Sequence, residues 1–355
     1  ILTILRFILS CSAIITSRGK SPLLKPIQKK KVETRMKPEL LIIGDITPRM
    51  AAAFDASFVC HTFSDITDMD SFIAGKGQAI EAIATTGHDG VPAPLLTGLN
   101  QLKVISCYGV GYDAIDVGEA ASRGILVTHT PNVLNNEVAT TAVMLLMACY
   151  RQLIVNHNYI LAGDWVNKGN APLNRTIDGM SVGILGYGRI GQAIAKKLEA
   201  FGCEISYHAR SERSDSPHRY YAKLNDMARD VQAIIAITPG GAATKHLVNQ
   251  EILEALGPDG CLVNVARGTV VDEAALVDAL QKGTLGYAGL DVFEKEPQVP
   301  EALFDMPNVV LTPHIGSATV ETRQAMGDLT VDNLLHFFEK GSVLTPVPEC
   351  QHLIK

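Results

Sequence analysis

Three glycines at fixed spacing are the first residues in this chain that could do chemistry. Gly186, Gly188 and Gly191 form a GxGxxG run between an apolar stretch, "VGIL", and a helix-like stretch. In such a run the first glycine permits a tight turn, the second lets the backbone approach a pyrophosphate, and the third allows close helix–strand packing. N–H groups at the helix start then bind phosphate oxygens. This context favours a dinucleotide site over an ordinary glycine turn. The predicted contacts are Gly186, Tyr187, Gly188, Arg189, Ile190 and Gly191.

A second candidate lies in "SYHARSER", residues 206–213, about eighteen residues beyond the last glycine. A dinucleotide-binding unit normally has Asp or Glu here to bind the adenosine ribose. Ala209 stands at that position, followed by Arg210, Ser211 and Arg213. Either the GxGxxG run is accidental, or the cofactor carries a negative group on that ribose. Because the strand and helix support the run, we expect these three polar residues to bind a 2′-phosphate. NADPH is then the preferred cofactor and NADH the alternative one; a solvated basic turn is the competing interpretation.

Short β-rich runs alternate with helix-like segments along the chain, and these elements must position both loops. The first series begins at Glu39 and the second at about Met180. Such alternation is typical of parallel sheets with helices on both faces. We therefore predict an α/β protein with two doubly wound, Rossmann-like parallel-sheet domains and a cleft between them, where a ligand is expected to bind.

Two long helical stretches complete the predicted architecture. Residues 136–153 are almost continuously apolar, which favours burial on several sides, as in a domain-connecting or dimer-contact helix. The last helix, 320–339, follows the second series of strands, so it can fold back onto the first domain. The predicted domains are a substrate domain, 36–134 completed by 319–346, and a dinucleotide-binding domain, 135–318.

Composition narrows the class of protein. The chain has 355 residues, of which 47% are apolar and 19% charged, as expected for a folded protein with a sizeable core. Its formal net charge of −6 gives no reason to expect a nucleic acid as a partner. Seven cysteines are scattered without a CxxC pair, which indicates neither a disulfide framework nor a metal site. We expect a reducing compartment, the cytoplasm, and no metal ion.

The N-terminal segment, residues 1–35, has a character of its own. An apolar run interrupted by Arg6 precedes a basic stretch, whereas a secretory signal has its charge first. The run is also short for a membrane span, so no membrane association is expected. We interpret residues 1–35 as an extension outside the fold; a mitochondrial-type leader is the alternative.

Four longer motifs resemble those of one family. The stretches "GRIGQAIAKKL", "NVARGTVVDEAAL", "GLDVFEKEP" and "LTPHIGSAT" are similar to the D-isomer-specific 2-hydroxyacid dehydrogenases, and most of all to glyoxylate/hydroxypyruvate reductases. The resemblance extends from Met36 to about Pro346. It implies two doubly wound domains, the substrate domain being built from both ends of the chain. It also implies NAD(P)H-dependent reduction of small 2-keto acids to D-2-hydroxy acids.

The resemblance assigns the family's catalytic Arg, Glu and His to Arg267, Glu296 and His314. The fork of Arg267, just beyond a strand, suits a substrate carboxylate. His314 follows another strand and can protonate the carbonyl oxygen, while Glu296 stabilises the imidazolium. Taken singly, each has a plainer interpretation: a surface arginine, a structural histidine or an exposed turn carboxylate.

Further site residues are also implied by the resemblance. Asp291 would accept a hydrogen bond from the nicotinamide carboxamide, although a buried structural Asp is an equal alternative. Backbone N–H groups of Val110 and Gly111 would bind the substrate carboxylate opposite Arg267, with Tyr112 at the pocket wall.

Two further segments complete the predicted cofactor site. Pro239 and Thr244 belong to the turn that would border the adenosine. Thr140 stands where the family often has an acid, which weakens the expectation that Thr141 reaches the nicotinamide.

Several alternatives remain open at this stage. A NAD(P)-sensing regulatory protein, like the corepressors of the same fold, could also keep the three catalytic residues. Larger acids such as 2-ketogluconate or hydroxyphenylpyruvate compete with glyoxylate and hydroxypyruvate as substrates. The apolar helix and the family habit together predict a homodimer.

Overall fold

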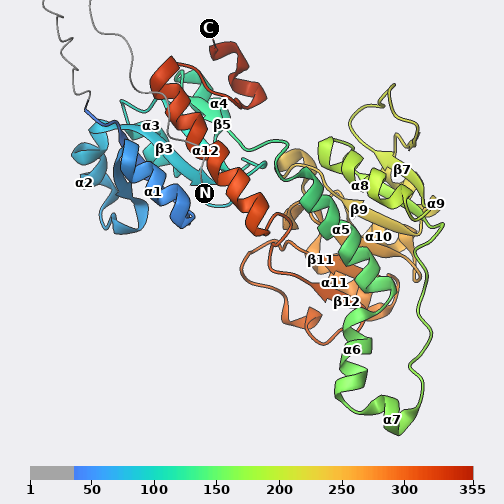
Figure 1. The fold of residues 1–355 in the computed structure, drawn as a ribbon. Coiled ribbons are helices and arrows are strands. Elements are labelled where there is room, and N and C mark those ends of the chain that lie inside the picture. Colours follow the sequence, from blue (N-terminus) through green and yellow to red (C-terminus); the bar gives the residue numbers. More distant parts are fainter. Residues whose placement is uncertain (1–35, 355) are drawn as a thin grey trace, which may run out of the picture. The chain divides into compact units, whose positions relative to one another are not determined.

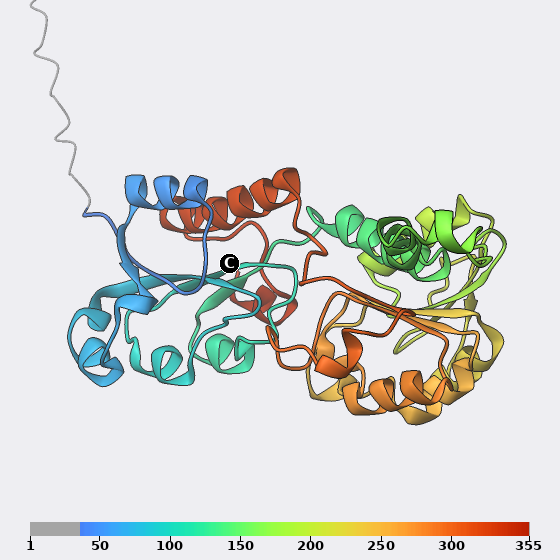
Figure 2. The ribbon, with the colours of Figure 1, turned by 90° about the horizontal axis from the view of Figure 1, so that it is seen from below.

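Two parallel β-sheets organise residues 36–354, which are the residues that the structure, a computed structural model, describes (Figure 1). The predicted extension at 1–35 lies outside these residues. Helices lie on both sides of each sheet (Figure 2), which is the doubly wound arrangement. The predicted fold class, α/β with two such sheets, is therefore confirmed.

The first sheet has the strand order β2-β1-β3-β4-β5, with every pair parallel. Its central strands are buried on both faces, as the apolar sequence of β4, "VISCY", requires. The strands are β1 (Glu39–Ile42), β2 (Val59–Thr62), β3 (Ile80–Thr86), β4 (Val104–Tyr108) and β5 (Leu126–Thr128). The helices between them are α1 (Pro48–Ser57), α2 (Met69–Ala74), α3 (Ala93–Gly98) and α4 (Val117–Ser122).

The second sheet has the order β12-β11-β10-β9-β6-β7-β8, again all parallel. The chain order reverses at β6, which lies between β7 and β9. Ligands bind at such a switch point, beyond the carboxyl ends of the strands. The strands are β6 (Ser181–Leu185), β7 (Glu204–His208), β8 (Arg219–Tyr220), β9 (Ala233–Ala236), β10 (Cys261–Asn264), β11 (Tyr287–Leu290) and β12 (Val309–Leu311). The helices between them are α8 (Arg189–Glu199), α9 (Leu224–Asp230), α10 (Gln250–Leu256) and α11 (Glu273–Lys282).

Successive residues of the second sheet belong to two different hydrophobic clusters. Ile184 and Ile235 pack into the cluster that includes α5 and α8, whereas their neighbours Leu185 and Ile234 pack into the cluster that includes α9 to α11. This alternation follows from the period of two in a β-strand. It explains why β9, "AIIA", is apolar at every position.

The last helix, α12 (Val320–Lys340), returns to the first sheet (Figure 1). It packs against β4 and α1, and the Ser106 hydroxyl of β4 donates to the backbone carbonyl of Thr330 at 2.9 Å. Thr319 caps the helix by accepting the Thr322 N–H. Both ends of the described chain therefore contribute to the same layer of structure, while the domain boundaries given above stay predictions.

Three consecutive helices, α5 (Asn135–Tyr150), α6 (Leu153–Leu161) and α7 (Asp164–Lys168), precede the second sheet. The first of them packs against α8, β10 and β11, so it is buried as expected. The other two were not predicted, and they expose Leu161, Trp165 and Val166. In the described part of the chain no single helix could span a membrane; α5 with α6 satisfies length and composition, but the pair is bent by 56°.

Candidate active site

The glycine loop joins β6 to α8 as predicted. Gly186 has a φ of 102°, a left-handed value that glycine adopts without strain. A Cβ on Gly191 would lie 2.2 Å from the Gly186 carbonyl oxygen, so this close helix–strand contact requires glycine. A Cβ on Gly188 would meet no atom within 4 Å, so the backbone there faces open space. The loop therefore fits a pyrophosphate at the start of α8, where the helix N–H groups point.

The loop after β7 carries the basic residues expected to select the cofactor. Arg210 and Ser211 are exposed. Arg213 instead forms a two-point ion pair with Asp215, with Nε–Oδ1 at 3.0 Å and Nη2–Oδ2 at 2.7 Å. Position 209 offers no carboxylate, as expected. Of the two arginines, Arg210 is thus the one whose guanidinium no ion pair holds among the described residues.

Arg267 lies just after β10 and contacts the loop that follows β4. Its Nη2 would be 1.8 Å from a Cβ on Gly111, so the guanidinium lies directly against that glycine. Its Nε also donates to Asp113 Oδ1 at 3.2 Å, and its Nη2 forms an ion pair with the same oxygen at 3.1 Å. The structure thus brings Arg267 to the predicted substrate loop, and it adds Asp113, which the sequence motifs did not single out.

Two features fix the backbone around Arg267. The Asn264 side chain donates to the Arg267 carbonyl at 3.0 Å and accepts the Ala266 N–H at 3.1 Å. A Cβ on Gly268 would lie 1.9 Å from the Phe293 carbonyl carbon, so the residue after Arg267 packs on the segment that leads to Glu296. The Arg267 loop and the Glu296 loop are therefore in direct contact.

His314 and Glu296 form a hydrogen-bonded pair. The Nδ1 atom of His314 lies 2.8 Å from Glu296 Oε2, and the Phe293 N–H donates to Oε1 at 3.1 Å. Burial favours a higher pKa for Glu296, but its bonds with His314 and Phe293, together with the imidazolium charge, lower the pKa below its ordinary value. Among residues 36–354, no hydrogen bond engages the other imidazole nitrogen, Nε2.

Asp291 holds the turn that carries His314. Its carboxylate accepts the Thr312 hydroxyl and the Ile315 N–H at 2.7 Å, and the Gly316 N–H at 2.8 Å. Burial raises the pKa of this carboxyl, although the three donors oppose that shift. His314 itself has a φ of 53°, an uncommon conformation that the turn must maintain. These contacts give Asp291 a positioning role; its contact with the nicotinamide stays a prediction.

The loop after β4 presents the predicted substrate-binding backbone. Within residues 36–354 no hydrogen bond occupies the N–H groups of Val110 and Gly111. The Val110 carbonyl is bonded to His129 Nδ1 at 2.9 Å. Tyr112 packs its ring against His129 and donates to Glu349 at 3.1 Å, so the tyrosine has structural partners.

The remaining predicted residues are Pro239 and Thr244, in the turn after β9, and Thr141, beside the His314 turn. Thr244 donates to the Pro239 carbonyl at 2.8 Å, which closes the turn after β9. Thr141 is buried and donates to the Gly316 carbonyl at 3.4 Å, beside the His314 turn. Thr140 is exposed and bonds within its own helix. In the described ranges no group of three potential ligands could hold a metal ion.

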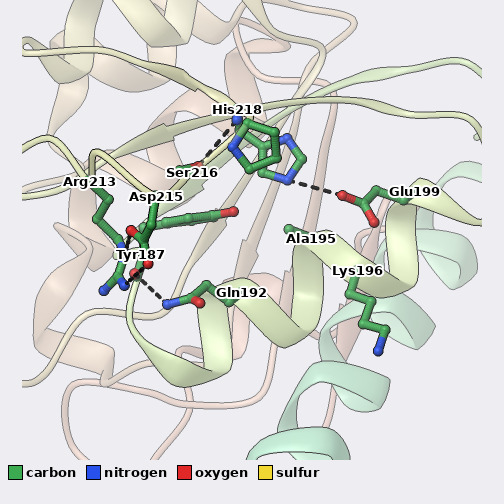
Figure 3. Close-up of a pocket in the computed structure, with 10 residues that line it drawn as sticks. Tyr187, Gln192, Ala195, Lys196, Glu199, Arg213, Asp215, Ser216 and His218 are labelled. Carbon is green, nitrogen blue, oxygen red and sulfur yellow. Dashed lines mark hydrogen bonds and ion pairs between the residues drawn. The ribbon is translucent and has the colours of Figure 1, made fainter.

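A pocket of about 330 Å³ lies between α8 and residues 213–218 (Figure 3). It is lined by Tyr187, Gln192, Lys196, Arg213 and His218 among others, and His218 pairs with Glu199 across it at 3.1 Å. The catalytic candidates do not line it. The pocket therefore borders the loop after β7, residues 209–213, which is expected to select the cofactor. It is separate from the expected reaction centre.

The structure combines a doubly wound sheet and its glycine loop with a hydrogen-bonded His–Glu pair and an arginine. This combination is typical of NAD(P)-dependent oxidoreductases. Residues 143–316 match the model of the D-isomer specific 2-hydroxyacid dehydrogenase NAD-binding domain. Together with the relatives below, this match shows that the chain belongs to the D-isomer-specific 2-hydroxyacid dehydrogenase family.

Curated relatives of the chain are named reductases. A 2-ketogluconate reductase of Gluconobacter oxydans is 42% identical over 311 residues, 88% of this chain and 99% of that protein. A glyoxylate/hydroxypyruvate reductase of Arabidopsis thaliana is 45% identical over 270 residues, 76% of this chain and 86% of that protein. The predicted family is thus confirmed.

A similar solved structure has a bound cofactor. It is an NADPH-dependent glyoxylate/hydroxypyruvate reductase from Sinorhizobium meliloti in complex with NADP and malonate. It is 46% identical, covers 88% of this chain and 98% of its own, and superposes with a TM-score of 0.84. This chain is therefore an enzyme with an NAD(P)-binding domain.

Proposed function

We propose that this enzyme reduces small 2-keto acids to D-2-hydroxy acids, with glyoxylate and hydroxypyruvate as the first candidate substrates. The observation that carries the proposal is the Glu296–His314 pair, Nδ1 to Oε2 2.8 Å, in a loop system that contacts the loop of Arg267. An acid beside a carboxylate-binding cation is what keto-acid reduction requires. The relatives' names supply the substrate class.

The residues of the chain divide the work as follows. One N–H on Nη1 and the N–H groups of Nη2 of Arg267 remain for the substrate carboxylate, since Nε donates to Asp113 and the other Nη1 N–H to the Ala266 carbonyl. The Val110 and Gly111 N–H groups bind the same carboxylate from the other side. The dinucleotide, when bound, supplies the hydride. His314 donates a proton from Nε2 to the carbonyl oxygen and is left neutral, and Glu296 stabilises the imidazolium before that transfer.

We further propose that NADPH is preferred to NADH. Support comes from the exposed Arg210 and Ser211 and from the absence of a carboxylate at position 209. An acidic residue there would repel a 2′-phosphate, whereas an arginine binds it through charge-assisted bonds.

A steady-state panel of glyoxylate, hydroxypyruvate, 2-ketogluconate and hydroxyphenylpyruvate, each with NADPH and NADH, tests both proposals. Arg210→Ala should raise the NADPH KM by about tenfold, because a charge-assisted bond contributes about 1.5 kcal/mol, and leave the NADH KM unchanged. Arg219→Ala, which removes an exposed arginine of β8 that pairs with Asp230 of α9, is the matched control. Turnover of none of these acids contradicts the substrate class, and equal use of NADH by the wild type contradicts the cofactor preference.

Two coarser properties complete the proposal. A homodimer is supported by the exposed apolar side chains of α6 and α7, since such clusters commonly mark protein interfaces. Light scattering that gives a monomer at assay concentration contradicts it.

A cytoplasmic location is supported by the free cysteines of the described chain, and cell fractionation tests it.

A further inference from the structure

A cluster of three tyrosines lies beneath the cofactor-selecting loop. Tyr187 comes from the glycine loop, Tyr207 from β7 and Tyr220 from β8. The rings of Tyr187 and Tyr207 are stacked, with centroids 4.1 Å apart and planes 22° apart. The rings of Tyr207 and Tyr220 are also in contact, with centroids 5.4 Å apart. The cluster thus joins the loop that binds the pyrophosphate to the elements that carry residues 209–213.

The hydroxyl groups of the cluster hold both ends of residues 209–213. Tyr207 Oη accepts the backbone N–H of Arg213 at 2.8 Å. Tyr220 Oη donates to the Ala209 carbonyl at 3.3 Å. Arg210 and Ser211, which carry the predicted 2′-phosphate contacts, lie between these two anchors. The backbone that presents them is therefore fixed by side chains of the sheet.

The following segment is held from the same side. The Tyr187 hydroxyl is hydrogen-bonded to Ser216, whose hydroxyl accepts the His218 N–H at 3.2 Å. Tyr187 and His218 also make an edge-on ring contact, with centroids 5.9 Å apart (Figure 3). The turn between Arg213 and His218 is thereby tied to the glycine loop.

Tyr207 is the central member because it is fully buried, with 0% of its surface exposed. A buried ring in contact with two others cannot change position without disturbing the sheet. A loop whose backbone is held before the ligand arrives loses less conformational entropy on binding. The bond from Tyr207 to the Arg213 N–H therefore favours a ligand with a 2′-phosphate, which residues 209–213 are expected to bind.

We propose that Tyr207 is a positioning residue for recognition of the cofactor's 2′-phosphate, acting through the backbone of Arg213, with Tyr220 as the second anchor at Ala209. This inference rests on the proposed NADPH preference and names the device that sets it. The pyrophosphate, which both cofactors share, binds at the glycine loop. Loss of the Tyr207 hydroxyl should accordingly affect NADPH and spare NADH.

Tyr207→Phe keeps the ring and removes the hydroxyl, and binding of adenosine 2′,5′-bisphosphate and of ADP is measured by calorimetry on the full chain. We expect the bisphosphate Kd to rise about fivefold, the effect of one hydrogen bond of about 1 kcal/mol, and the ADP Kd to stay unchanged. The NADPH KM should rise by the same factor without change in kcat or in the NADH KM. Tyr221→Phe is the matched control, since its buried hydroxyl bonds to Asp230 outside the loop.

The outcomes separate this inference from the proposed function. If the wild type binds the bisphosphate no more tightly than ADP, the NADPH preference itself fails, and the inference with it. If the wild type discriminates but Tyr207→Phe keeps the same ratio, or weakens both ligands equally, only the positioning role is overturned. Should Tyr207→Phe unfold, Tyr220→Phe makes the same test at the Ala209 anchor, with the same expected ratio and the same contradicting results.

Discussion

Asp113 shows what a single residue adds to the reaction centre. It holds the Nε–Nη2 edge of Arg267 at 3.1 to 3.3 Å, on a side chain that must present its remaining N–H groups to a substrate. Held in this way, the guanidinium has fewer orientations to lose when a carboxylate binds. We therefore expect Asp113 to influence substrate binding through Arg267.

Replacing Asp113 by Asn should raise the KM for the keto acid about fivefold, since one charge-assisted bond to Arg267 is weakened by about 1 kcal/mol. The KM for NADPH should not change. Asp328→Asn, which alters another Arg–Asp pair, the one between α1 and α12, is the control. A keto-acid KM that falls in Asp113→Asn would mean that Asp113 competes with the substrate, which is the opposite of this account.

Family-like stretches predicted some residues of the candidate site and left others unnoticed. Arg267, Glu296 and His314 could be predicted because each lies in a stretch that resembles a family motif, and their roles stay predictions until variants are assayed. Asp113 was missed because its partner Arg267 is distant in sequence. Asn264 and Tyr207 were missed because their bonds to nearby backbone groups follow from loop geometry and not from residue type. The Asp215 that takes up Arg213 was near in sequence, but its pairing could not be read from spacing.

At the scale of elements, the turn after β12 is held in place by two carboxylates. Asp291 fixes its backbone, and Glu296 fixes the imidazole of His314. The helix predicted at 320–339 is found at Val320–Lys340, and Thr319 caps its start. Helices α6 and α7 were missed, because their exposed apolar residues follow no pattern that burial would impose.

The stability of this turn should depend on pH. The pKa of Glu296 in the folded protein is lowered from the ordinary 4.5. The ionised carboxylate therefore stabilises the fold above pH 4.5, and this contribution is lost as pH falls through the lowered pKa. Glu296→Gln should reduce the free energy of unfolding at pH 7 by more than at pH 4, as measured by urea denaturation. A difference that stays the same at both pH values contradicts an ionised pair.

At the scale of the whole molecule, both sheets are parallel and the chain returns to the first sheet through α12. The alternation of strands and helices was enough to predict this much. The salt bridge from Asp113 to Arg267 and the tyrosine cluster were beyond prediction, because each depends on contacts between segments far apart in sequence. The fold brings Arg267, which follows a strand of the second series, against Gly111 of the predicted substrate loop in the first series, as the proposed reduction requires.

The most direct test of the central claim is the turnover of His314→Ala with glyoxylate and NADPH, alongside its NADPH Kd. The control is His336→Ala, which removes a histidine of α12 that is bonded to Ser342. If His314 donates the proton, kcat should fall about 10²- to 10⁴-fold, the usual contribution of a general acid, while the Kd for NADPH stays unchanged. A His314→Ala enzyme that keeps most of its kcat would contradict the account.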